Sequence, residues 1–547
     1  MDTEVIIVGA GPAGMVAAMD LDARGISTIV LERRRFLQLP SVKSNHVSAR
    51  TMERFRMLGI ADSVRKAGLP VAHSHDVSFR TTVTGHELSR IPIPSSSERF
   101  SSKVGPDTQW ATPEPPHRIN QTYLEPILMK HLATLPNVQL MNETEMTSFT
   151  QGDNRVSVHA RSVDGAGKFE FTAQYLIGCD GGSSMVRKAI GSQFRGDGVL
   201  QEVQSTCIRA PRLIERVQGE PAWCYYTFNP RRNGSVYAID GNEIFLVHAY
   251  LSEQESREGS VDRDEAIRTI LGVDKQFDYD VVSCEDWTAR RLVADRLSQG
   301  RVFICGDAAH IWVPFAGYGM NAGIADALNL TWLLGSRLGG WGASGILEAY
   351  DAERQPITEQ VSIQAMRHSN AVMAARASVP VDVEKNSAAG AAARSRVGAE
   401  AYDLNVKQFA AEGLNFGYCY DHSPIILYDG EQAPELNMDS YTPSTAPGCR
   451  LPHFFLGGGY SLYDKLGHGY TLVVTDTSVD YQPLVVAALG RGIPLSVVNI
   501  ADEDYPPQYQ HALIVCRQDQ HVAWRGNTVP DDLGALLDRL CGVFSAG

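Results

Sequence analysis

The sequence of 547 residues has no run of about 20 consecutive apolar residues, which excludes an ordinary membrane-spanning helix. It has no basic leader either, because Asp2 and Glu4 precede the first apolar stretch, so no signal peptide is expected. Basic residues are fewer than acidic ones, with 49 lysines and arginines against 63 aspartates and glutamates, so the net charge is -14. Nucleic acid and anionic membrane surfaces are therefore not expected as partners.

Cysteine pairs are also missing. Nine cysteines are scattered from Cys179 to Cys541 without a CxxC pair, which fits neither a disulfide framework nor a zinc site. No metal site is expected, and the protein is expected in the reducing cytoplasm.

The first feature present is a strand-turn-helix unit. The apolar run Val5–Val8 predicts a strand, Gly9–Gly14 a turn, Met15–Ala23 a helix and Thr28–Leu31 a second strand. The turn Gly-Ala-Gly-Pro-Ala-Gly fits GxGxxG, whose glycines allow a tight turn, close approach to a pyrophosphate and close helix packing. A plain tight turn is the alternative reading, and the motif alone does not distinguish NAD from FAD.

An acidic residue and a basic cluster follow this unit. Glu32, at the end of the second strand, would hydrogen-bond the ribose hydroxyls of a dinucleotide. Arg33–Arg35 comes next, and fits either a surface cluster or a small anion site, which leaves recognition of a 2′-phosphate open.

Two later motifs narrow the ligand to FAD. Tyr175–Gly181 and Arg301–Asp307 each place Gly and Asp directly after an apolar strand. With these motifs the chain resembles the single-component (class A) flavoprotein aromatic hydroxylases of the p-hydroxybenzoate hydroxylase and phenol hydroxylase type. The resemblance extends over nearly the whole chain.

The resemblance implies roles for individual residues. Asp307 would bind the ribityl chain of FAD, Gly319–Asn321 would lie along the isoalloxazine ring, Arg50 would lie near the pyrophosphate, and Gln121 would contact the flavin. Asp180 would act mainly through structure, with a direct contact to FAD or NAD(P)H as the alternative. The full set of expected cofactor-binding residues is Gly9, Gly11, Ala13, Gly14, Glu32, Arg33, Arg50, Gln121, Asp307, Gly319, Met320 and Asn321. The alternative for Arg50 is an exposed arginine at a helix start.

The sequence departs from the family near the flavin ring. The family often has two glycines after the proline there, whereas this chain has Pro314-Phe315-Ala316-Gly317. The loop beside the flavin ring therefore departs from the family pattern at Ala316.

Candidate substrate residues are fewer. His46 lies between the second strand and Arg50, where the phenol hydroxylase branch places active-site residues, and its pKa range suits a base that activates a phenol. A structural histidine is the alternative. Trp223, Tyr226 and Pro314 are candidates for the aromatic pocket, although aromatic strand residues are often simple core.

The implied reaction is hydroxylation of a phenolic ring. FAD would be reduced by NADPH or NADH, dioxygen would form a flavin C4a-hydroperoxide, and its terminal oxygen would pass to the ring. No second GxGxxG unit exists for a separate nicotinamide domain. The alternatives are a related flavin halogenase, oxidase or reductase, and a noncatalytic flavin-binding protein.

The expected fold class is α/β plus α+β. A Rossmann-like FAD-binding domain (1–76, 105–200 and 285–380) would carry an inserted sheet-rich substrate domain (77–104 and 201–284). A connector (381–447) would follow, because small residues dominate Asn386–Ala393. Residues 448–547 resemble the thioredoxin-like C-terminal domain of the phenol hydroxylase branch, without redox cysteines. A homodimer is left open.

Overall fold

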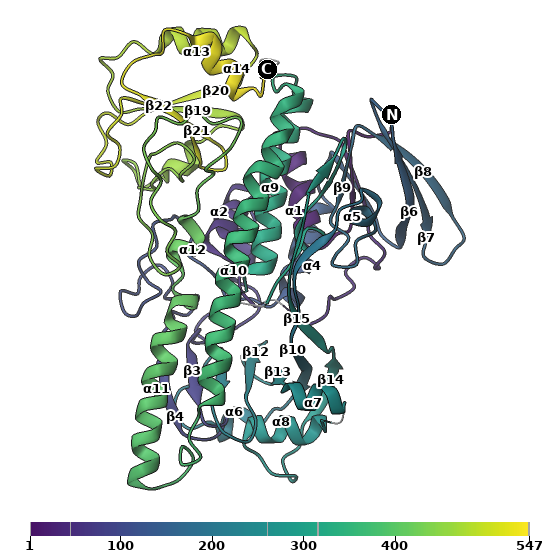
Figure 1. The fold of residues 1–547 in the computed structure, drawn as a ribbon, viewed down its shortest axis with the longest axis vertical. Coiled ribbons are helices and arrows are strands. Elements are labelled where there is room, and N and C mark those ends of the chain that lie inside the picture. The colour runs from purple at the N-terminus through teal and green to yellow at the C-terminus, as the bar shows by residue number, and fades with distance from the viewer. Residues whose placement is uncertain (1, 44, 260, 314–316, 545–547) are drawn as a thin grey trace.

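The computed structural model describes residues 2–43, 45–259, 261–313 and 317–544, and its elements form four sheets joined by long helices (Figure 1). None of the helices in these ranges is long and apolar enough to cross a membrane. The first sheet has six strands in the order β16-β17-β9-β1-β2-β5, and only β16 runs antiparallel to its neighbour. Its strands are β1 (Val5–Val8), β2 (Thr28–Leu31), β5 (Val138–Met141), β9 (Tyr175–Gly178), β16 (Ser298–Gln299) and β17 (Val302–Ile304).

Helices cover this parallel sheet and bury its strands. Every residue of β1 and β2 is buried, as expected for strands that are apolar throughout. The covering helices and neighbouring turns are α1 (Pro12–Asp22), α2 (Ala49–Met57), α3 (Ala61–Arg65), α4 (Gln121–Leu132), α5 (Met185–Ala189), α9 (Tyr318–Leu338), η1 (Gly306–Ala308) and η2 (Ser344–Glu348). A small antiparallel sheet of β6 (Thr144–Gln151), β7 (Val156–Ser162) and β8 (Lys168–Ala173) extends beside it.

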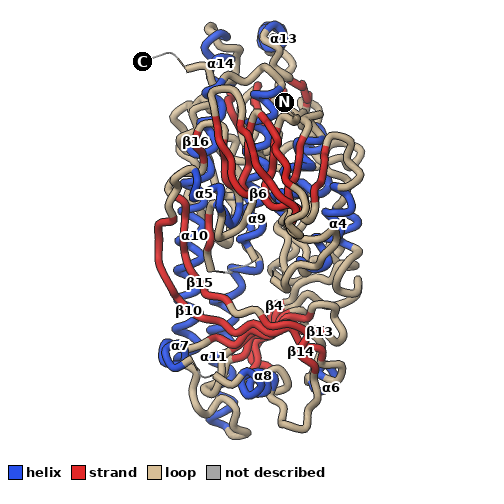
Figure 2. The backbone as a smooth tube through the Cα atoms, turned by 90° about the vertical axis from the view of Figure 1, so that its right-hand side faces the viewer, coloured by secondary structure: helices blue, strands red, loops and turns tan. Residues whose placement is uncertain are grey.

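The second large sheet has nine strands and lies below the first in Figure 2. Its order is β18-β15-β10-β13-β12-β11-β3-β4, with β14 paired to β10. Its strands are β3 (Val77–Arg80), β4 (Glu87–Ile91), β10 (Phe194–Arg209), β11 (Cys224–Thr227), β12 (Gly234–Ala238), β13 (Ile244–Tyr250), β14 (Asp280–Cys284), β15 (Trp287–Ala294) and β18 (His310–Ile311), with α6 (Leu213–Arg216), α7 (Glu253–Glu258) and α8 (Arg263–Leu271) between them.

Two long strands join the sheets. The paired strands β10 and β15 run from the parallel unit into the nine-stranded sheet (Figure 2). The boundary expected between 200 and 201 therefore falls inside a strand and not in a loop. How the chain divides into domains stays a prediction.

The connector prediction at Asn386–Ala393 is wrong. After α10 (Ala349–Ala377) the chain forms a 22-residue helix, α11 (Ala388–Phe409), which Ser387 caps by accepting a hydrogen bond from the Gly390 amide at 3.2 Å. Alanine is the strongest helix former, so an alanine-rich run favours a helix over a flexible linker. The helix packs closely on β4, because a Cβ added to Gly398 would lie 2.2 Å from the Leu88 carbonyl oxygen.

The C-terminal part forms the fourth sheet, in the order β20-β19-β21-β22. The strands β19 and β20 are parallel and the other pairs antiparallel. The elements are α12 (Glu412–Phe416), η3 (Leu462–Lys465), β19 (Tyr470–Val474), α13 (Gln482–Gly490), β20 (Leu495–Asn499), β21 (Leu513–Arg517), β22 (Val522–Gly526) and α14 (Leu533–Leu540). Apolar runs of the sequence near Tyr470, Leu495, Ala512 and Val522 form these strands.

Two buried histidines make stability depend on pH. Burial, as the main cause, lowers the pKa of His117 and of His521 to about 3. Their folded-state pKa lies below the unfolded value, so their contribution is complete above pH 6.5 and is lost as the pH falls from 6.5 towards 3. We expect the unfolding free energy to fall by about 1.4 kcal/mol per pH unit for each of them between pH 6 and 4.

Denaturant unfolding at pH 7.5, 6 and 5 measures this slope. In His521→Gln the slope of the unfolding free energy against pH should be smaller, because one titrating histidine no longer contributes to it. An unchanged slope in that variant would contradict the assignment.

Candidate functional site: a glycine turn, a free carboxylate and an aromatic wall

The glycine turn between β1 and α1 has the geometry that its sequence predicts. Gly9 has φ +99°, and a Cβ there would lie 2.4 Å from the Cys179 carbonyl oxygen. A Cβ on Gly14 would lie 2.0 Å from the Gly9 oxygen. Gly11, in contrast, has no atom within 4 Å of its Cβ position, so its backbone is open on the side that faces the cavity. The helix start has neither a side-chain cap nor an acidic residue, which suits an anion.

Glu32 supports this turn. Its carboxylate accepts hydrogen bonds from the Ala10 amide at 2.7 Å and the Arg34 amide at 2.8 Å. Arg34 also pairs with Glu125 at 2.8 Å, whereas Arg33 is exposed at the surface. Sequence reasoning missed Arg34, although the basic run Arg33–Arg35 pointed to this segment.

A cavity of about 570 Å³ runs from this turn to the nine-stranded sheet. Gly11, Ala13 and Gly14 line one end of it, together with Gln121, whose Nε2 donates to Glu125 at 2.5 Å. Among the described residues, no partner contacts the exposed carboxylate of Asp307, which lines the same end. A carboxylate free within a cavity is suited to accept hydrogen bonds from ligand hydroxyls.

The first turn of α9 forms the middle of the cavity. Gly319 and Met320 line it, and Gly317 begins the helix with φ +66°. Asn321 is turned away: its Nδ2 donates to the carbonyl oxygens of His46 at 3.1 Å and Gly317 at 2.7 Å. Asn321 therefore fixes this turn through the backbone. Pro314 and the rest of the unusual loop 314–316 lie outside the described residues.

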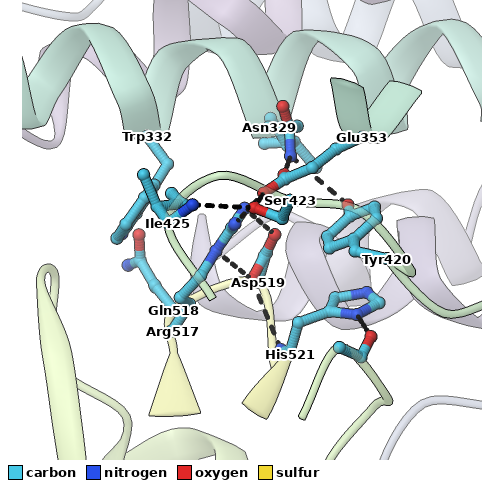
Figure 3. A network of polar contacts seen from close by, with 12 residues as sticks. Asn329, Trp332, Glu353, Tyr420, Ser423, Ile425, Arg517, Gln518, Asp519 and His521 are labelled. Carbon is cyan, nitrogen blue, oxygen red and sulfur yellow. Dashed lines mark hydrogen bonds and ion pairs between the residues drawn. The ribbon is translucent and has the colours of Figure 1, made fainter. Parts of the chain in front are cut away.

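Arg50 lies elsewhere. Its Nη2 donates to the Asp519 carbonyl oxygen at 2.7 Å and its Nη1 contacts His521 at 3.1 Å, so it faces the C-terminal sheet. Figure 3 shows Asp519 and His521 within this buried polar network. Arg50 lines a separate small cavity beside α9.

The Asp180 side chain has a structural role, as expected. Its carboxylate accepts from the amides of Met185 at 2.7 Å and Val186 at 3.1 Å, so it caps the start of α5. Arg187 donates to the Ala308 carbonyl oxygen at 3.1 Å and so ties α5 to the turn that carries Asp307.

Aromatic side chains line the far end of the cavity. Trp223 and Tyr226, predicted from the sequence, are both in this wall. Sequence reasoning missed its other members, which are Tyr237, His248, Tyr250, Trp287, Gln408 and Phe409. The alternating strand patterns at 235–239 and 244–248 carried a signal for two of them, Tyr237 and His248. Phe409 could not be found, because it comes from the helix taken for a connector.

His46 and Arg118 stand between the two ends. His46 lies against Gly317, whose Cβ position is 2.7 Å from the His46 Cβ, and its Nδ1 contacts Arg118 Nη1. Burial first, then the charge of Arg118, lowers the pKa of His46 well below its usual range. Because arginine only donates, Nδ1 is the acceptor and Nε2 carries the proton of a neutral ring.

Arg118 brings excess positive charge to the wall. It is buried, and its nearest carboxylate, Asp107 at 3.7 Å, is shared with Arg99 at 3.1 Å. Arg118 Nε has no hydrogen-bond partner. Two arginines and one aspartate leave one positive charge beside the aromatic wall.

Known proteins are similar to this chain in sequence and in architecture. Residues 2–365 match the family described as FAD binding domain. Phenol 2-monooxygenase of Pseudomonas sp. (strain EST1001) is 32% identical over 580 residues, covering 99% of this chain and 93% of that protein. Aklavinone 12-hydroxylase RdmE of Streptomyces purpurascens is 28% identical over 561 residues, covering 98% of each.

Solved structures extend the similarity to the whole fold. The rebeccamycin biosynthetic enzyme RebC with reduced flavin has a TM-score of 0.89 at 30% identity, covering 100% of this chain and 99% of that one. A ternary complex of aklavinone-11 hydroxylase with FAD and aklavinone has a TM-score of 0.82 at 25% identity, covering 98% and 99%. The open backbone of Gly11 and the free carboxylate of Asp307 fit a dinucleotide with a hydroxylated chain. The chain belongs to the FAD binding domain family and is a FAD-dependent monooxygenase of the class A phenol hydroxylase type.

Proposed function

We propose that this monooxygenase hydroxylates a phenolic ring that binds between the first turn of α9 and the aromatic wall, with NAD(P)H and dioxygen as co-substrates. The observation that carries the proposal is one continuous cavity that joins the glycine turn, Asp307 and the wall. A flat ring packs well against Trp223 and Tyr226. Relatives named phenol 2-monooxygenase and 2,4-dichlorophenol 6-monooxygenase support the substrate class.

Most of the expected cofactor residues line the same cavity, whereas Gly9, Glu32, Arg33, Arg50 and Asn321 do not. Bound FAD would supply hydride acceptance from NAD(P)H and oxygen transfer from dioxygen. Gly9, Gly11, Ala13 and Gly14 would admit its pyrophosphate, Glu32 its ribose, and Asp307 its ribityl hydroxyls. Gln121, Gly319 and Met320 would border the flavin. Arg33 would act only at the outer edge of the cofactor site. Arg50 and Asn321 would not contact the cofactor and would instead hold neighbouring segments of the chain in place.

The ionisation of the phenol is assigned to Arg118 together with His46. A base with a strongly lowered pKa does not keep a proton at neutral pH, so His46 is better suited to donate from Nε2 to a phenolate oxygen. The unbalanced charge of Arg118 would lower the pKa of a phenol bound beside it. Deprotonation, with loss of the proton to solvent, makes the ring more reactive towards an electrophilic oxygen, and the aromatic rings of the wall reduce contact of the bound ring with water.

The test is spectroscopic and chemical. Purified protein should be yellow, a phenol should accelerate NAD(P)H oxidation, and labelled dioxygen should appear in the product. Incorporation of halide would favour a halogenase, and incorporation of hydrogen would favour a reductase. Formation of hydrogen peroxide without a hydroxylated product would favour an oxidase. Absence of stimulated turnover across a phenol panel would favour a noncatalytic flavin-binding protein.

Substitution of Arg118 should affect the chemical step. We expect Arg118→Gln to lower kcat by roughly 100-fold, the lower range for assisted proton transfer, with FAD still bound. The pH at which kcat rises should move upwards, because the phenol loses a stabilising charge. Arg118→Lys should restore part of the rate. The control is Arg212→Gln, an exposed arginine. An unmoved pH profile would contradict the assignment.

The C-terminal part would be a thioredoxin-like unit in a scaffold role, supported by its strand order and by its buried Cys516 and Cys541, which are not paired. The protein would work in the cytoplasm with its cysteines as thiols. It would form a homodimer, which light scattering can test.

A further inference from the structure

Arg376, near the end of α10, is a buried cation without a carboxylate. Its side chain belongs to a residue that is 7% exposed, and its Nε and Nη2 have no hydrogen-bond partner. Within the described part of the chain, no aspartate or glutamate lies within ion-pair distance of it. A buried charge in this state is costly, so an arginine here calls for an explanation.

Three aromatic rings compensate only part of the charge. The guanidinium lies 4.3 Å from the centroid of Tyr250, 5.3 Å from that of Tyr226 and 5.8 Å from that of Phe228. Such contacts stabilise a cation through the ring faces. They provide no acceptor for the N–H groups, which point outwards in the guanidinium plane. The N–H groups of Arg376 Nε and Nη2 are therefore without an acceptor.

The location of Arg376 relates it to the cavity. Tyr226 and Tyr250 both line the aromatic wall, so Arg376 lies directly behind that wall. Its charge reaches the wall: burial first, and then Arg376, lowers the pKa of the wall residue His248 to about 4.

Arg376 is also at the far end from the flavin turn. His46 contacts that turn and Arg118, and Arg118 lies 5.1 Å from the Trp223 ring. The Trp223 ring is 5.6 Å from Tyr237, whose hydroxyl is 3.4 Å from that of Tyr226. Arg376 lies beyond these rings, on the side away from the flavin turn. A phenol of one ring beside Arg118 would not extend so far.

We propose that Arg376 recognises a carboxylate on an extended phenolic substrate, at the end remote from the ring that is hydroxylated. This inference rests on the proposed function, since it takes the cavity to bind a phenol. The anion would supply the acceptors that the guanidinium lacks, by displacing the ring edge of Tyr226 or Tyr250. Arg118 would then set the position of the phenol, and Arg376 would select the substrate.

Binding of a matched ligand pair tests the proposal without turnover. The probes are 4′-hydroxybiphenyl-4-carboxylate and its neutral carboxamide, titrated against the FAD-loaded protein by calorimetry. We expect the acid to bind about tenfold more tightly than the amide, a difference of about 1.4 kcal/mol. Arg376→Gln should abolish this preference and change the amide affinity by less than about twofold. Arg376→Lys should keep part of it.

The control is Arg367→Gln, an exposed arginine of the same helix, which should keep the full preference. Equal losses for both ligands in Arg376→Gln would assign the residue a purely structural role and overturn the proposal. Equal affinities in the unsubstituted protein, or no binding of either probe, would overturn it too, whether or not the variant folds. Turnover of neutral phenols without acid preference would refute only this inference. Acid preference without turnover of any phenol would refute only the hydroxylation.

Discussion

Gly11→Val gives a protein that folds normally and is colourless, because it no longer binds FAD. The position tolerates a side chain in the free protein: φ is -73°, and no atom lies within 4 Å of the added Cβ. The open space is the place where a pyrophosphate would approach the backbone. We expect the dissociation constant for FAD to rise at least about 100-fold, or about 2.7 kcal/mol. Flavin fluorescence titration measures it.

Two comparisons separate loss of the ligand from loss of the fold. Gly14→Ala should lower the melting temperature as well as the flavin content, because its Cβ would lie 2.0 Å from the Gly9 oxygen. Gly490→Ala, in the C-terminal sheet region, has an open Cβ position and should change neither. Normal FAD affinity in Gly11→Val would place the cofactor away from this turn.

Glu353→Gln lowers the unfolding free energy by about 1.5–3 kcal/mol, the range for a hydrogen bond to a charged group, because Arg517 keeps Asp519 as an ion-pair partner at 2.6 Å. The Glu353 carboxylate accepts from Arg517 Nη1 at 2.6 Å, and neither side chain is exposed (Figure 3). It also accepts from Ser423 Oγ and Asn329 Nδ2, each at 2.6 Å. One carboxylate therefore joins α9, α10 and the C-terminal sheet.

Chemical denaturation measures this effect, and flavin content reports whether the loss spreads to the cofactor site. The control is Glu400→Gln, in an exposed i,i+4 pair with Arg396, which should cost less than about 0.5 kcal/mol. A loss of equal size in the two variants would mean that Glu353 does not join the C-terminal sheet to the rest of the chain.

The sequence by itself determined the geometry of the glycine turn at the proposed cofactor end of the site. The glycine turn, its strand and its helix lie within about 30 residues. The backbone geometry of the turn therefore depends on residues that are close together in the sequence. Asp307 follows a buried strand of the same parallel sheet, and the carboxyl ends of parallel strands meet at one edge. The positions of Gly9, Gly14 and Asp307 at one edge of the sheet could therefore be predicted without coordinates.

Only the tertiary structure decided the substrate end. The side chains of the substrate end come from separate strands and from α11. The alanine-rich sequence of α11 led to the prediction of a connector, although it forms a packed helix. The proposed functions of Arg118 and Arg376 depend on what surrounds them: a carboxylate shared between two arginines in one case, and no carboxylate among the described residues in the other. Whether a charge is paired depends on distances between residues far apart in the chain, and no local pattern encodes those distances.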